Sequence, residues 1–248
     1  MKIILCGYTG QMGREVRECA VRAAGCEIVC GVDPMADAPD GVCVLSFDEC
    51  TAEADVIIDF SHHTMTGALL DFAEKRNLPV VLATTGQTDA EKARILAAAE
   101  RIPVFLAANY SLGIAVLTDL VRRAAALYPD AEIEIVEQHH DRKLDAPSGT
   151  ALSLFDAVKD VRPAATANTG RSGQGKRTPD EVGIHAIRMG NIVGVHEVMI
   201  GTQNERITLK HEAFSRGVFA EGSLKAAAFL NGKKPGIYDM KDLIAEGE

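Results

Sequence analysis

The chain has no tryptophan, and aromatic residues make up only 5% of its 248 residues. Positive charge is also scarce, with 26 lysines and arginines against 35 acidic residues and a formal net charge of −9. Binding to nucleic acid or to anionic membranes is therefore not expected, and an anionic ligand has to be held by a local cluster of cations. No apolar run approaches the roughly 18 residues of a membrane span. The opening MKIILCG is interrupted by glycine too soon for a secretory signal, so the expected location is the cytoplasm.

Cysteine is absent from the last four-fifths of the chain, and all six cysteines fall within the first fifty residues. No Cys-x-x-Cys occurs, and the spacings match no zinc site, so no metal is expected. Two of the cysteines sit in apolar runs, where a thiol behaves as a small core side chain. The sequence predicts free, mostly buried thiols at Cys6, Cys19, Cys26, Cys30, Cys43 and Cys50.

Strand and helix patterns alternate through the first half of the chain. Short apolar runs predict strands, and longer periodic runs between them predict helices, one of which has Thr88 as a plausible N-cap. This order is typical of a parallel sheet with crossover helices. The predicted strands cover residues 2–6, 26–32, 55–60, 79–83 and 103–107, and the predicted helices cover 10–24, 64–76 and 88–100.

The pattern changes near Asn109. Three strand candidates follow one another closely in the second half, which indicates an antiparallel or mixed sheet. The last helix could pack on either part of the chain. We expect strands at 132–137, 183–189, 192–200 and 206–211, helices at 114–127, 149–161 and 217–230, a long loop over 162–181 and a short tail near 237–245. The fold class is α/β: a Rossmann-like parallel sheet with a second α+β domain built on a mixed sheet.

A glycine-rich turn, Gly7-Tyr-Thr-Gly10-Gln-Met-Gly13, lies between the first strand and the first helix. Glycines here permit a tight turn and a close approach of the backbone to a pyrophosphate. The alternative is a plain strand–turn–helix. Asp33 follows about 20 residues later, where an acid binds the adenine ribose. No arginine adjoins Asp33, which favours NAD(H) over NADP(H), although Arg14 and Lys75 could compensate.

Other segments stand where strands of such a sheet end, which is where ligands bind. They are 59–61, 83–86 and 107–110, and their small and hydroxyl side chains suit close contact with a ribose or nicotinamide. Ordinary loop chemistry is the alternative for each of them.

Residues 139–150, HHDRKLDAPSGT, form a basic cluster before a helix start in an otherwise acidic chain. His139 and Lys143 share a face if this stretch makes a helical turn. A hydride acceptor needs such a proton donor or cation beside it. Ser148 and Thr150 act either as helix caps or, with the N–H groups there, as ligands of a carboxylate. Three further histidines in strand candidates are expected to be structural: His185, His196 and His211.

These motifs, in this order, resemble the dihydrodipicolinate reductase family over nearly the whole chain. The most specific match is the Asp-Ala-Pro-Ser-Gly-Thr run after His-His-x-x-Lys. The others are 7–13, Asp-Phe-Ser at 59–61, Thr-Thr-Gly at 84–86, Ala-Asn-Tyr-Ser at 108–111 and Arg-x-Gly-x-Ile-x-Gly-x-His at 188–196.

The resemblance implies a reductase that transfers a hydride from NADH, or from NADPH, to the cyclic dicarboxylate 4-hydroxy-tetrahydrodipicolinate, giving tetrahydrodipicolinate in diaminopimelate and lysine biosynthesis. Residues 1–108 with 217–248 would bind the nucleotide, and 109–216 would bind the substrate and form a homotetramer. His139 and Lys143 would be catalytic. The substrate would be bound by His140, Ser148, Gly149 and Thr150. The cofactor would be lined by Gly7, Tyr8, Thr9, Gly10, Gln11, Met12, Asp33, Phe60, Ala83, Thr84, Thr85, Ala107, Ala108, Asn109 and Tyr110.

Three positions depart from the family pattern. Gln11 replaces a frequent arginine or lysine near the cofactor phosphates, which weakens NADPH binding; Ala83 replaces a usual glycine, and Tyr110 a frequent phenylalanine. Two other functions compete: a Rossmann reductase of another amino or keto acid, and a catalytically silent NAD(H)-sensing protein. The silent protein would have no need of His139 and Lys143 together.

Overall fold

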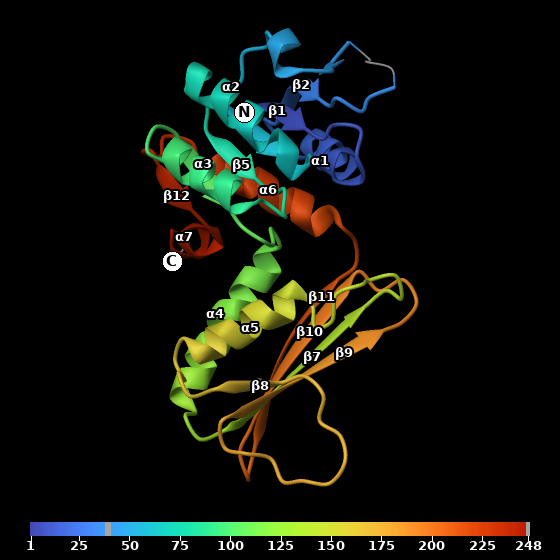
Figure 1. Ribbon diagram of the computed structural model, residues 1–248, viewed down its shortest axis with the longest axis vertical. Coiled ribbons are helices and arrows are strands. Elements are labelled where there is room, and N and C mark those ends of the chain that lie inside the picture. Colours follow the sequence, from blue (N-terminus) through green and yellow to red (C-terminus); the bar gives the residue numbers. More distant parts are fainter. Residues whose placement is uncertain (38–40, 247–248) are drawn as a thin grey trace. The chain divides into compact units, whose positions relative to one another are not determined.

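A computed structural model describes residues 1–37 and 41–246. The chain forms two compact units, coloured along the sequence in Figure 1. The first unit contains Met1–Ser111 together with the chain from Arg216 onward, and the second contains Leu112–Ser215. The chain therefore leaves the first unit once and returns to it.

The first unit is built on a parallel sheet, which confirms the Rossmann-like prediction. In the described residues this sheet has seven strands in the order β12-β6-β5-β4-β1-β2-β3. The strands are β1 (Lys2–Cys6), β2 (Glu27–Val32), β3 (Cys43–Val44), β4 (Val56–Asp59), β5 (Val80–Leu82), β6 (Pro103–Leu106) and β12 (Gly236–Tyr238). The two outermost strands, β3 and β12, were not predicted, because two or three residues are too few to show a periodicity.

Helices of the first unit pack in pairs: α1 lies on α6, and α2 lies on α3. Thr88 caps α3 as predicted, in a capping box with Glu91. The helix α6, which follows the second unit in the chain, also contacts β4 and β5, so it packs on the parallel sheet of the first unit. The helices are α1 (Gln11–Arg22), α2 (Thr66–Arg76), α3 (Asp89–Ala99), α6 (Gly217–Phe229) and α7 (Met240–Ala245), with single turns η1 (Phe47–Glu49) and η2 (His63–Met65).

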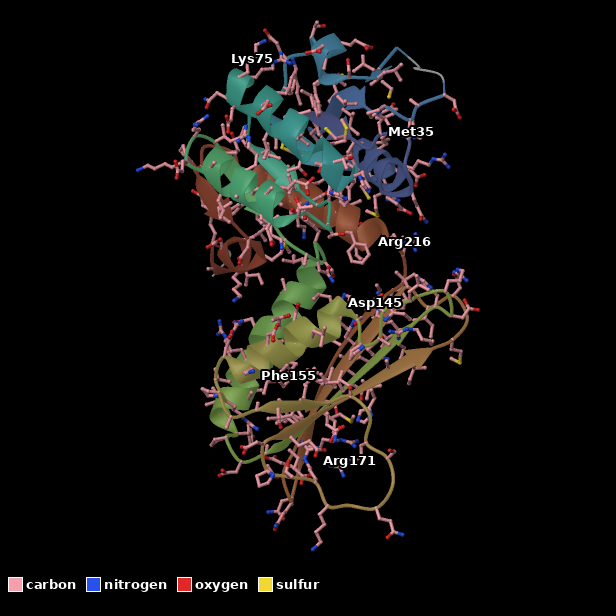
Figure 2. The ribbon with its side chains drawn as sticks, viewed as in Figure 1. Met35, Lys75, Asp145, Phe155, Arg171 and Arg216 are labelled. Atoms are coloured by element: carbon pink, nitrogen blue, oxygen red, sulfur yellow. The ribbon has the colours of Figure 1, made fainter. Side chains whose placement is uncertain are left out.

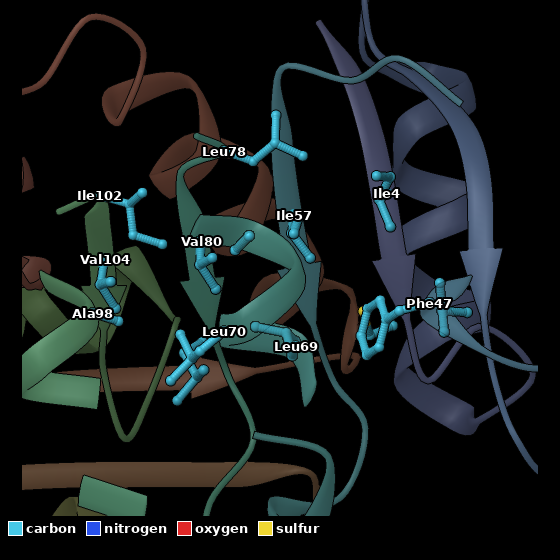
Figure 3. Packing of buried hydrophobic residues seen from close by; sticks show 14 of the residues in the cluster. Ile4, Phe47, Ile57, Leu69, Leu70, Leu78, Val80, Ala98, Ile102 and Val104 are labelled. Atoms are coloured by element: carbon cyan, nitrogen blue, oxygen red, sulfur yellow. The ribbon is translucent and has the colours of Figure 1, made fainter. Parts of the chain in front are cut away.

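The core of the first unit is a cluster of aliphatic side chains from the central strands and from α2 and α3. Ile57, Val80 and Val104 on adjacent strands are fully buried beside Leu69 and Leu70 of α2 (Figure 3). Burial on both faces explains why these strands are continuous hydrophobic runs in the sequence. All six cysteines are free thiols, and five of them are buried.

The second unit is a mixed sheet with two helices, again as predicted. Over the described residues, five strands run in the order β11-β10-β7-β9-β8. Pairing is antiparallel between β7, β10 and β11 and parallel between β7, β9 and β8. The elements are α4 (Leu112–Leu127), β7 (Glu132–His139), α5 (Gly149–Lys159), β8 (Thr166–Asn168), β9 (Glu181–Arg188), β10 (Gly194–Gly201) and β11 (Arg206–Ala213).

One prediction for the second unit was wrong. Residues 162–181 were expected to form a structureless loop, but they contain β8, and β9 begins at Glu181. β8 pairs with β9 from Thr166 opposite Glu181 to Asn168 opposite Gly183. Its three residues, of which two are polar and two are exposed, lack the alternation that identifies a half-buried strand.

Alternation along β7 decides which of its side chains enter the core. Ile133 and Ile135 are buried in a cluster with residues of α4 and α5, which pack on each other and on this sheet. Glu137 and His139 continue the same alternation and are buried as well. A carboxylate and an imidazole are thus placed on the core-facing side of the strand at its end. Among the described helices, none is both long and apolar enough to span a bilayer.

Candidate active site

The turn after β1 has two positions that only glycine can fill. Gly7 has a φ of +74°, and a Cβ there would lie 2.4 Å from the carbonyl oxygen of Phe60. A Cβ at Gly13 would lie 2.2 Å from the carbonyl oxygen of Gly7. These contacts let α1 start directly against the strand, with Gly10 as its N-cap. The N-terminus of α1 thereby becomes an anion site made of main-chain N–H groups and the helix dipole.

Asp33, the residue after β2, is tied to this turn. Thr9 donates its N–H and its hydroxyl to Oδ2 of Asp33 at 2.8 and 2.5 Å, and Met35 donates its N–H to Oδ1 at 3.0 Å. Burial alone would raise the pKa of Asp33, but these hydrogen bonds outweigh it and hold the pKa below its ordinary value. Asp33 is therefore an ionised acceptor. Its Oδ2 accepts both Thr9 donors, and its Oδ1, which accepts the Met35 N–H, offers its second lone pair to a hydroxyl donor.

Gln11 at the start of α1 has a cation beside it that the sequence did not reveal. Its Oε1 accepts a hydrogen bond from the guanidinium of Arg216, which immediately precedes α6 (labelled in Figure 2). The two residues are 205 positions apart in the chain. At position 11 this protein thus has a neutral side chain that holds an arginine.

Asp59 joins the carboxyl ends of two neighbouring strands. It is 1% exposed at the end of β4 and accepts the N–H and the hydroxyl of Ser61 at 3.1 and 2.5 Å. Burial raises the pKa of Asp59, and the hydrogen bonds from Ser61 oppose that rise only in part. The Ala83 N–H also donates to the carbonyl of Asp59 at 2.9 Å. The strand-end segments 59–61 and 83–86 are therefore brought together.

Tyr110 is buried with its hydroxyl directed into the sheet. The hydroxyl donates to the carbonyl oxygens of Leu82 and Phe105 at 2.9 and 3.1 Å, and the ring stands edge-on to Phe60 with centroids 6.3 Å apart. The hydroxyl that distinguishes Tyr110 from phenylalanine is thus satisfied within the fold. Tyr8 is buried too, and its ring packs on Gly31 and under the Arg17 guanidinium. At the turn, a ligand would therefore meet the main chain of Tyr8 and not its ring.

The remaining candidate cofactor residues lie on the connections beside these groups. Asn109 accepts the N–H of Ser111 at 2.8 Å. Thr84 is 7% exposed and its carbonyl accepts from Gln87 at 2.6 Å. Met12 lies in the first turn of α1, Thr85 follows β5, and Ala107 and Ala108 follow β6.

In the second unit, Glu137 is the centre of a buried hydrogen-bond network. It is 0% exposed, and its Oε2 lies 2.5 Å from Nδ1 of His139. Arg188, opposite His139 in the β7–β9 register, donates to Oε2 at 2.8 Å and to Oε1 at 2.7 Å. The Ser148 N–H donates to Oε1 at 3.0 Å. Burial would raise the pKa of Glu137, but these partners hold it below its ordinary value, so Glu137 is a carboxylate.

His139 is neutral at neutral pH, with a defined tautomer. Burial lowers its pKa most, and the charges of Lys143 and Arg188 add to that, while Glu137 opposes them. Because Glu137 is a carboxylate, Nδ1 of His139 has to carry the hydrogen in their contact. The lone pair is therefore on Nε2, and this nitrogen is the one available to accept a proton.

Lys143 is close enough to His139 for its charge to lower the His139 pKa, although the two residues do not lie on one face of a helical turn. Residues 139–143 do not make the helical turn on which a shared face depended: His139 ends a strand, and a turn follows in which the Lys143 N–H donates to the His140 carbonyl at 3.2 Å. The Lys143 ammonium is 2.7 Å from Oδ1 of Asp145, which lies in the loop before α5 (Figure 2). The hydrogen bond from Lys143 lowers the pKa of Asp145.

His196 belongs to the same cluster, although the sequence favoured a purely structural place for it. It lies on β10 at 3% exposure, and its ring is edge-on to that of His139 with centroids 5.2 Å apart. Its Nε2 is 3.2 Å from the Ser148 hydroxyl. Burial, aided by His139, lowers the pKa of His196 to about 4. His185, by contrast, binds Glu134 at 2.7 Å on the other side of the strand alternation.

The N-terminus of α5 adjoins this network. Ser148 is its N-cap, as predicted, with its hydroxyl accepting the Ala151 N–H at 3.2 Å. Gly149 and Thr150 form the first turn, where N–H groups and the helix dipole favour an anion. His140 is held by its main chain, which donates to Ile192 at 2.8 Å. In the described part of the chain, no cluster of three or more His, Cys, Asp or Glu side chains could hold a metal ion.

Four residues were not predicted as members of these sites: Glu137, Arg188, His196 and Arg216. The signal for Glu137 was present, since residues i and i+2 of a strand share a face and His139 was already a candidate. Arg188 and Arg216 depend on strand register and on the return of the chain, which a single sequence does not reveal.

Comparison with known proteins covers both units. The family model described as dihydrodipicolinate reductase, N-terminus, matches residues 1–110, and the one described as dihydrodipicolinate reductase, C-terminus, matches 113–244. The chain is 45% identical over 249 residues to a 4-hydroxy-tetrahydrodipicolinate reductase of Caldanaerobacter subterraneus, covering 100% of this chain and 99% of that protein. It is 42% identical to one from Clostridium novyi, covering 98% of each.

Solved structures share the fold. A dipicolinate-bound dihydrodipicolinate reductase from Paenisporosarcina sp. TG-14 superposes with a TM-score of 0.81 at 24% identity, covering 96% of this chain and 97% of that one. A myo-inositol dehydrogenase from Corynebacterium glutamicum superposes with a TM-score of 0.60 at 15% identity, covering 99% of this chain and 92% of the other.

Proposed function

The chain belongs to the dihydrodipicolinate reductase family, and on that premise we propose how its residues carry out the reaction. The reaction is an NAD(P)H-dependent reduction of 4-hydroxy-tetrahydrodipicolinate to tetrahydrodipicolinate. In the net change a hydride replaces the ring hydroxyl. The hydroxyl leaves as water, so each turnover takes up one proton. The protein has to supply that proton and hold two carboxylates while the nicotinamide supplies the hydride.

The observation that carries the assignment of catalytic residues is the buried Glu137–His139 pair beside Lys143. His139 has Nδ1 fixed at 2.5 Å from a carboxylate and is influenced by the Lys143 charge. Lys143 is a proton donor that reaches the leaving hydroxyl, and Nε2 of His139 accepts a proton and returns it. The lowered pKa of His139 suits a group that is neutral when it starts.

Substrate carboxylates bind at the N-terminus of α5. His140, Gly149 and Thr150 contact them, with main-chain N–H groups and the helix dipole as the source of attraction. Ser148 has a different role, because its N–H is used by Glu137 and its hydroxyl by His196 and Ala151. Ser148 therefore positions the turn that the substrate meets.

The cofactor binds across the carboxyl end of the parallel sheet, and NADH is preferred. The close approaches at Gly7 and Gly13 leave room for a pyrophosphate at α1, where Arg216 adds a cation. Ionised Asp33 accepts hydrogen bonds from the adenine ribose and repels a 2′-phosphate. Phe60, Ala83–Thr85 and Ala107–Tyr110 line the ribose and nicotinamide.

Each unit has one part of the task. Residues 1–108 with 217–248 bind the nucleotide, and 109–216 bind the substrate and assemble the protein as a homotetramer. Support for the assembly comes from the face of the second sheet that points away from its core. There Val136 and Met199 are half-buried and Ile187 is 40% exposed, beside polar side chains. A cytoplasmic location fits six free thiols, since oxidising compartments favour disulfides.

The test is the loss of reduced-nicotinamide absorbance with NADH and with NADPH, while a preceding synthase makes the unstable cyclic substrate in the same cuvette. We expect oxidation that requires the substrate and has a lower KM for NADH. Tight NADH binding without oxidation would contradict the catalytic assignment. A lower KM for NADPH would contradict the role given to Asp33. Light scattering during size-exclusion chromatography tests the tetramer.

A further inference from the structure

The connection between β9 and β10 carries a motif whose middle part has no role in the reduction described above. Arg-x-Gly-x-Ile-x-Gly-x-His at 188–196 begins at the last residue of β9 and ends at the third residue of β10. Its first residue, Arg188, holds both oxygens of Glu137. Its last residue, His196, has its ring edge-on to that of His139. The motif is therefore tied at both ends to the buried network of the second unit.

This connection crosses the end of β7, where His139 lies. In the sheet, β7 stands between β9 and β10, so the chain has to pass the end of β7 to go from one to the other (Figure 1). The Met189 N–H donates to the His139 carbonyl at 2.9 Å on the way. The Ile192 carbonyl accepts the His140 N–H at 2.8 Å. The connection thus fixes the strand end that carries His139 and leads into the turn of Lys143.

Gly194, the first residue of β10, is buried against the imidazole of His139. A Cβ at this position would lie 3.2 Å from Nε2 and 3.6 Å from Cδ2 of His139, and 3.8 Å from Cε1 of His196. The backbone does not call for glycine, because Gly194 lies outside the left-handed region that Gly190 adopts in the same connection. The missing side chain leaves space beside the nitrogen that carries the lone pair.

The His139 ring is not free to turn away from a side chain at position 194. Its Nδ1 is 2.5 Å from Oε2 of Glu137, and Arg188 and the Ser148 N–H hold that carboxylate in turn. The His196 ring stands edge-on to His139 and is itself held, with Nε2 3.2 Å from the Ser148 hydroxyl. A separation of 3.2 Å is shorter than the optimum of roughly 3.5–4.0 Å for carbon atoms in contact. A methyl group there would therefore press on Nε2.

We propose that Gly194 is a positioning residue of the reduction, which keeps open the space in which Nε2 of His139 exchanges its proton. The proposal rests on the proposed role of His139 as the base. A methyl group would take the place of the partner that Nε2 has to meet, and it would shield the imidazolium from water. Proton transfer would become slower, and the pKa of His139 would fall, because loss of hydration disfavours the charged form. The titratable and charged groups that face His139 would stay the same: Glu137 on β7, Arg188 on β9, His196 on β10 and Lys143 in the turn after β7.

The first test is Gly194→Ala in steady-state kinetics with NADH and with the cyclic substrate made in the same cuvette. We expect kcat to fall roughly 10-fold or more, because a misplacement of about 1 Å costs about 10²-fold in rate and this contact needs a few tenths of an ångström to relax. The acidic limb of the kcat profile should move to lower pH. The Kd of NADH should stay unchanged, since the nucleotide binds to the first unit.

Gly201→Ala is the matched control. It adds a methyl group at the other end of β10, where a Cβ would meet nothing within 4 Å. This variant should keep the native kcat and the native pH profile. Loss of turnover in both glycine variants would assign the effect to the strand as a whole and would contradict a specific role of Gly194.

A native kcat in Gly194→Ala would overturn the proposal, and so would a lower kcat with an unmoved acidic limb, which indicates a merely structural effect. His139→Gln separates these outcomes from a failure of the proposed function. If His139→Gln loses turnover while Gly194→Ala does not, His139 keeps its role and only Gly194 lacks one. If both variants keep native turnover, the role of His139 is wrong as well.

Labelling with diethyl pyrocarbonate gives a readout besides turnover. The reagent adds to an imidazole nitrogen that carries a lone pair, which in His139 is Nε2 because Nδ1 binds Glu137. In the native chain, peptide mapping by mass spectrometry should find the added group on His139 and not on His196, which is 3% exposed. The reaction at His139 should be several times slower in Gly194→Ala and unchanged in Gly201→Ala. If His139 of the native chain is as unreactive as His196, Nε2 is not open and the proposal fails, even if Gly194→Ala impairs folding.

Discussion

Glu137 and His139 lie two residues apart on β7, and Oε2 of Glu137 is 2.5 Å from Nδ1 of His139. The strand alternation gives both side chains the same face, so the contact is a consequence of local geometry. Arg188 holds the carboxylate from the neighbouring strand through both oxygens. The imidazole therefore has one tautomer and one orientation before substrate arrives, which reduces the reorganisation needed during turnover.

Glu137→Gln should lower kcat and move the acidic limb of the kcat profile to lower pH. Glu137 raises the pKa of His139, so its loss lowers that pKa further. His139 cannot act as a base once it is protonated. With a lower pKa it becomes protonated only at lower pH, so activity is kept to a lower pH. The variant also removes the charge that Arg188 contacts through both Glu137 oxygens, so the folded protein should lose stability as well.

The control for Glu137→Gln is Glu134→Gln on the same strand, whose carboxylate binds His185 and Arg177. It should leave the pH profile unchanged. If Glu137→Gln reduces the amount of folded protein but leaves the limb in place, Glu137 is only structural. Measurements at a temperature where both variants are folded separate the two effects.

His139→Gln and Lys143→Ala should each reduce turnover by roughly 10²–10⁴-fold, the usual contribution of a general acid or base. NADH affinity should stay nearly unchanged, because both residues lie in the other unit of the chain. Arg142→Ala is the matched control, since Arg142 is an exposed cation bonded to Asp141 and Asn191. Steady-state kinetics and NADH fluorescence titration provide the two readouts. Normal turnover in both catalytic variants would refute their roles.

Asp33→Ala should weaken NADH roughly 10- to 100-fold, which corresponds to loss of a hydrogen bond to a charged group. NADPH should lose less, because removal of the carboxylate also removes its repulsion of the 2′-phosphate. Asp37→Asn removes one charge from the same loop and controls for long-range electrostatics. Equal losses for both cofactors in Asp33→Ala, measured by titration, would argue against the ribose contact.

Arg216→Gln should weaken NADH and NADPH by similar factors and make their binding less dependent on salt. The guanidinium is held by Gln11 at the start of α1, where a pyrophosphate is common to both cofactors. Lys225→Gln, on the exposed face of α6, is the matched control. An unchanged salt dependence of the Kd in Arg216→Gln would show that the guanidinium does not meet the phosphates.

Stability should fall as pH drops from about 6.5 to about 4 because of His196. Its pKa in the folded protein is about 4, against an ordinary value near 6.5, so in this window the unfolded chain binds a proton that the folded chain excludes. The difference corresponds to roughly 3 kcal/mol at its full extent. Above the unfolded value both states are neutral and the effect vanishes.

Urea unfolding of the native chain and of His196→Asn, at several pH values in that window, measures this effect. The variant should lose less stability on acidification, even if it is less stable at neutral pH. Parallel curves for the two proteins would assign the acid sensitivity to other groups.

The apolar runs and the helix and strand periodicities of the sequence were sufficient to predict both sheets, but not the strands at the sheet edges. The five central strands of the first unit are continuous apolar runs because both faces are buried. β3 and β12 consist of two and three residues, and β8 is polar, so nothing in their composition marks them as strands. Their pairing is decided by partners elsewhere in the chain.

The candidate sites show the same division. Gly7, Gly13 and Asp33 were found because their roles follow from backbone geometry and from a spacing along the chain. The spacing of four between His139 and Lys143 would have given them a shared face in a helical turn, whereas the structure has the end of a strand followed by a turn there. Arg188 and Arg216 reach their partners through strand register and chain return, which require three-dimensional information.

The return of the chain to its first unit also sets an order for folding during synthesis. β12 pairs with β6, and α6 packs on α1, β4 and β5, yet both elements are translated after the whole of Leu112–Ser215. While the ribosome makes the second unit, the first has an open sheet edge and an uncovered apolar surface. The inserted unit can complete its own core first, because its contacts are internal to one continuous segment. Ribosome-bound chains that lack the last elements should therefore need chaperone protection at the nucleotide-binding sheet.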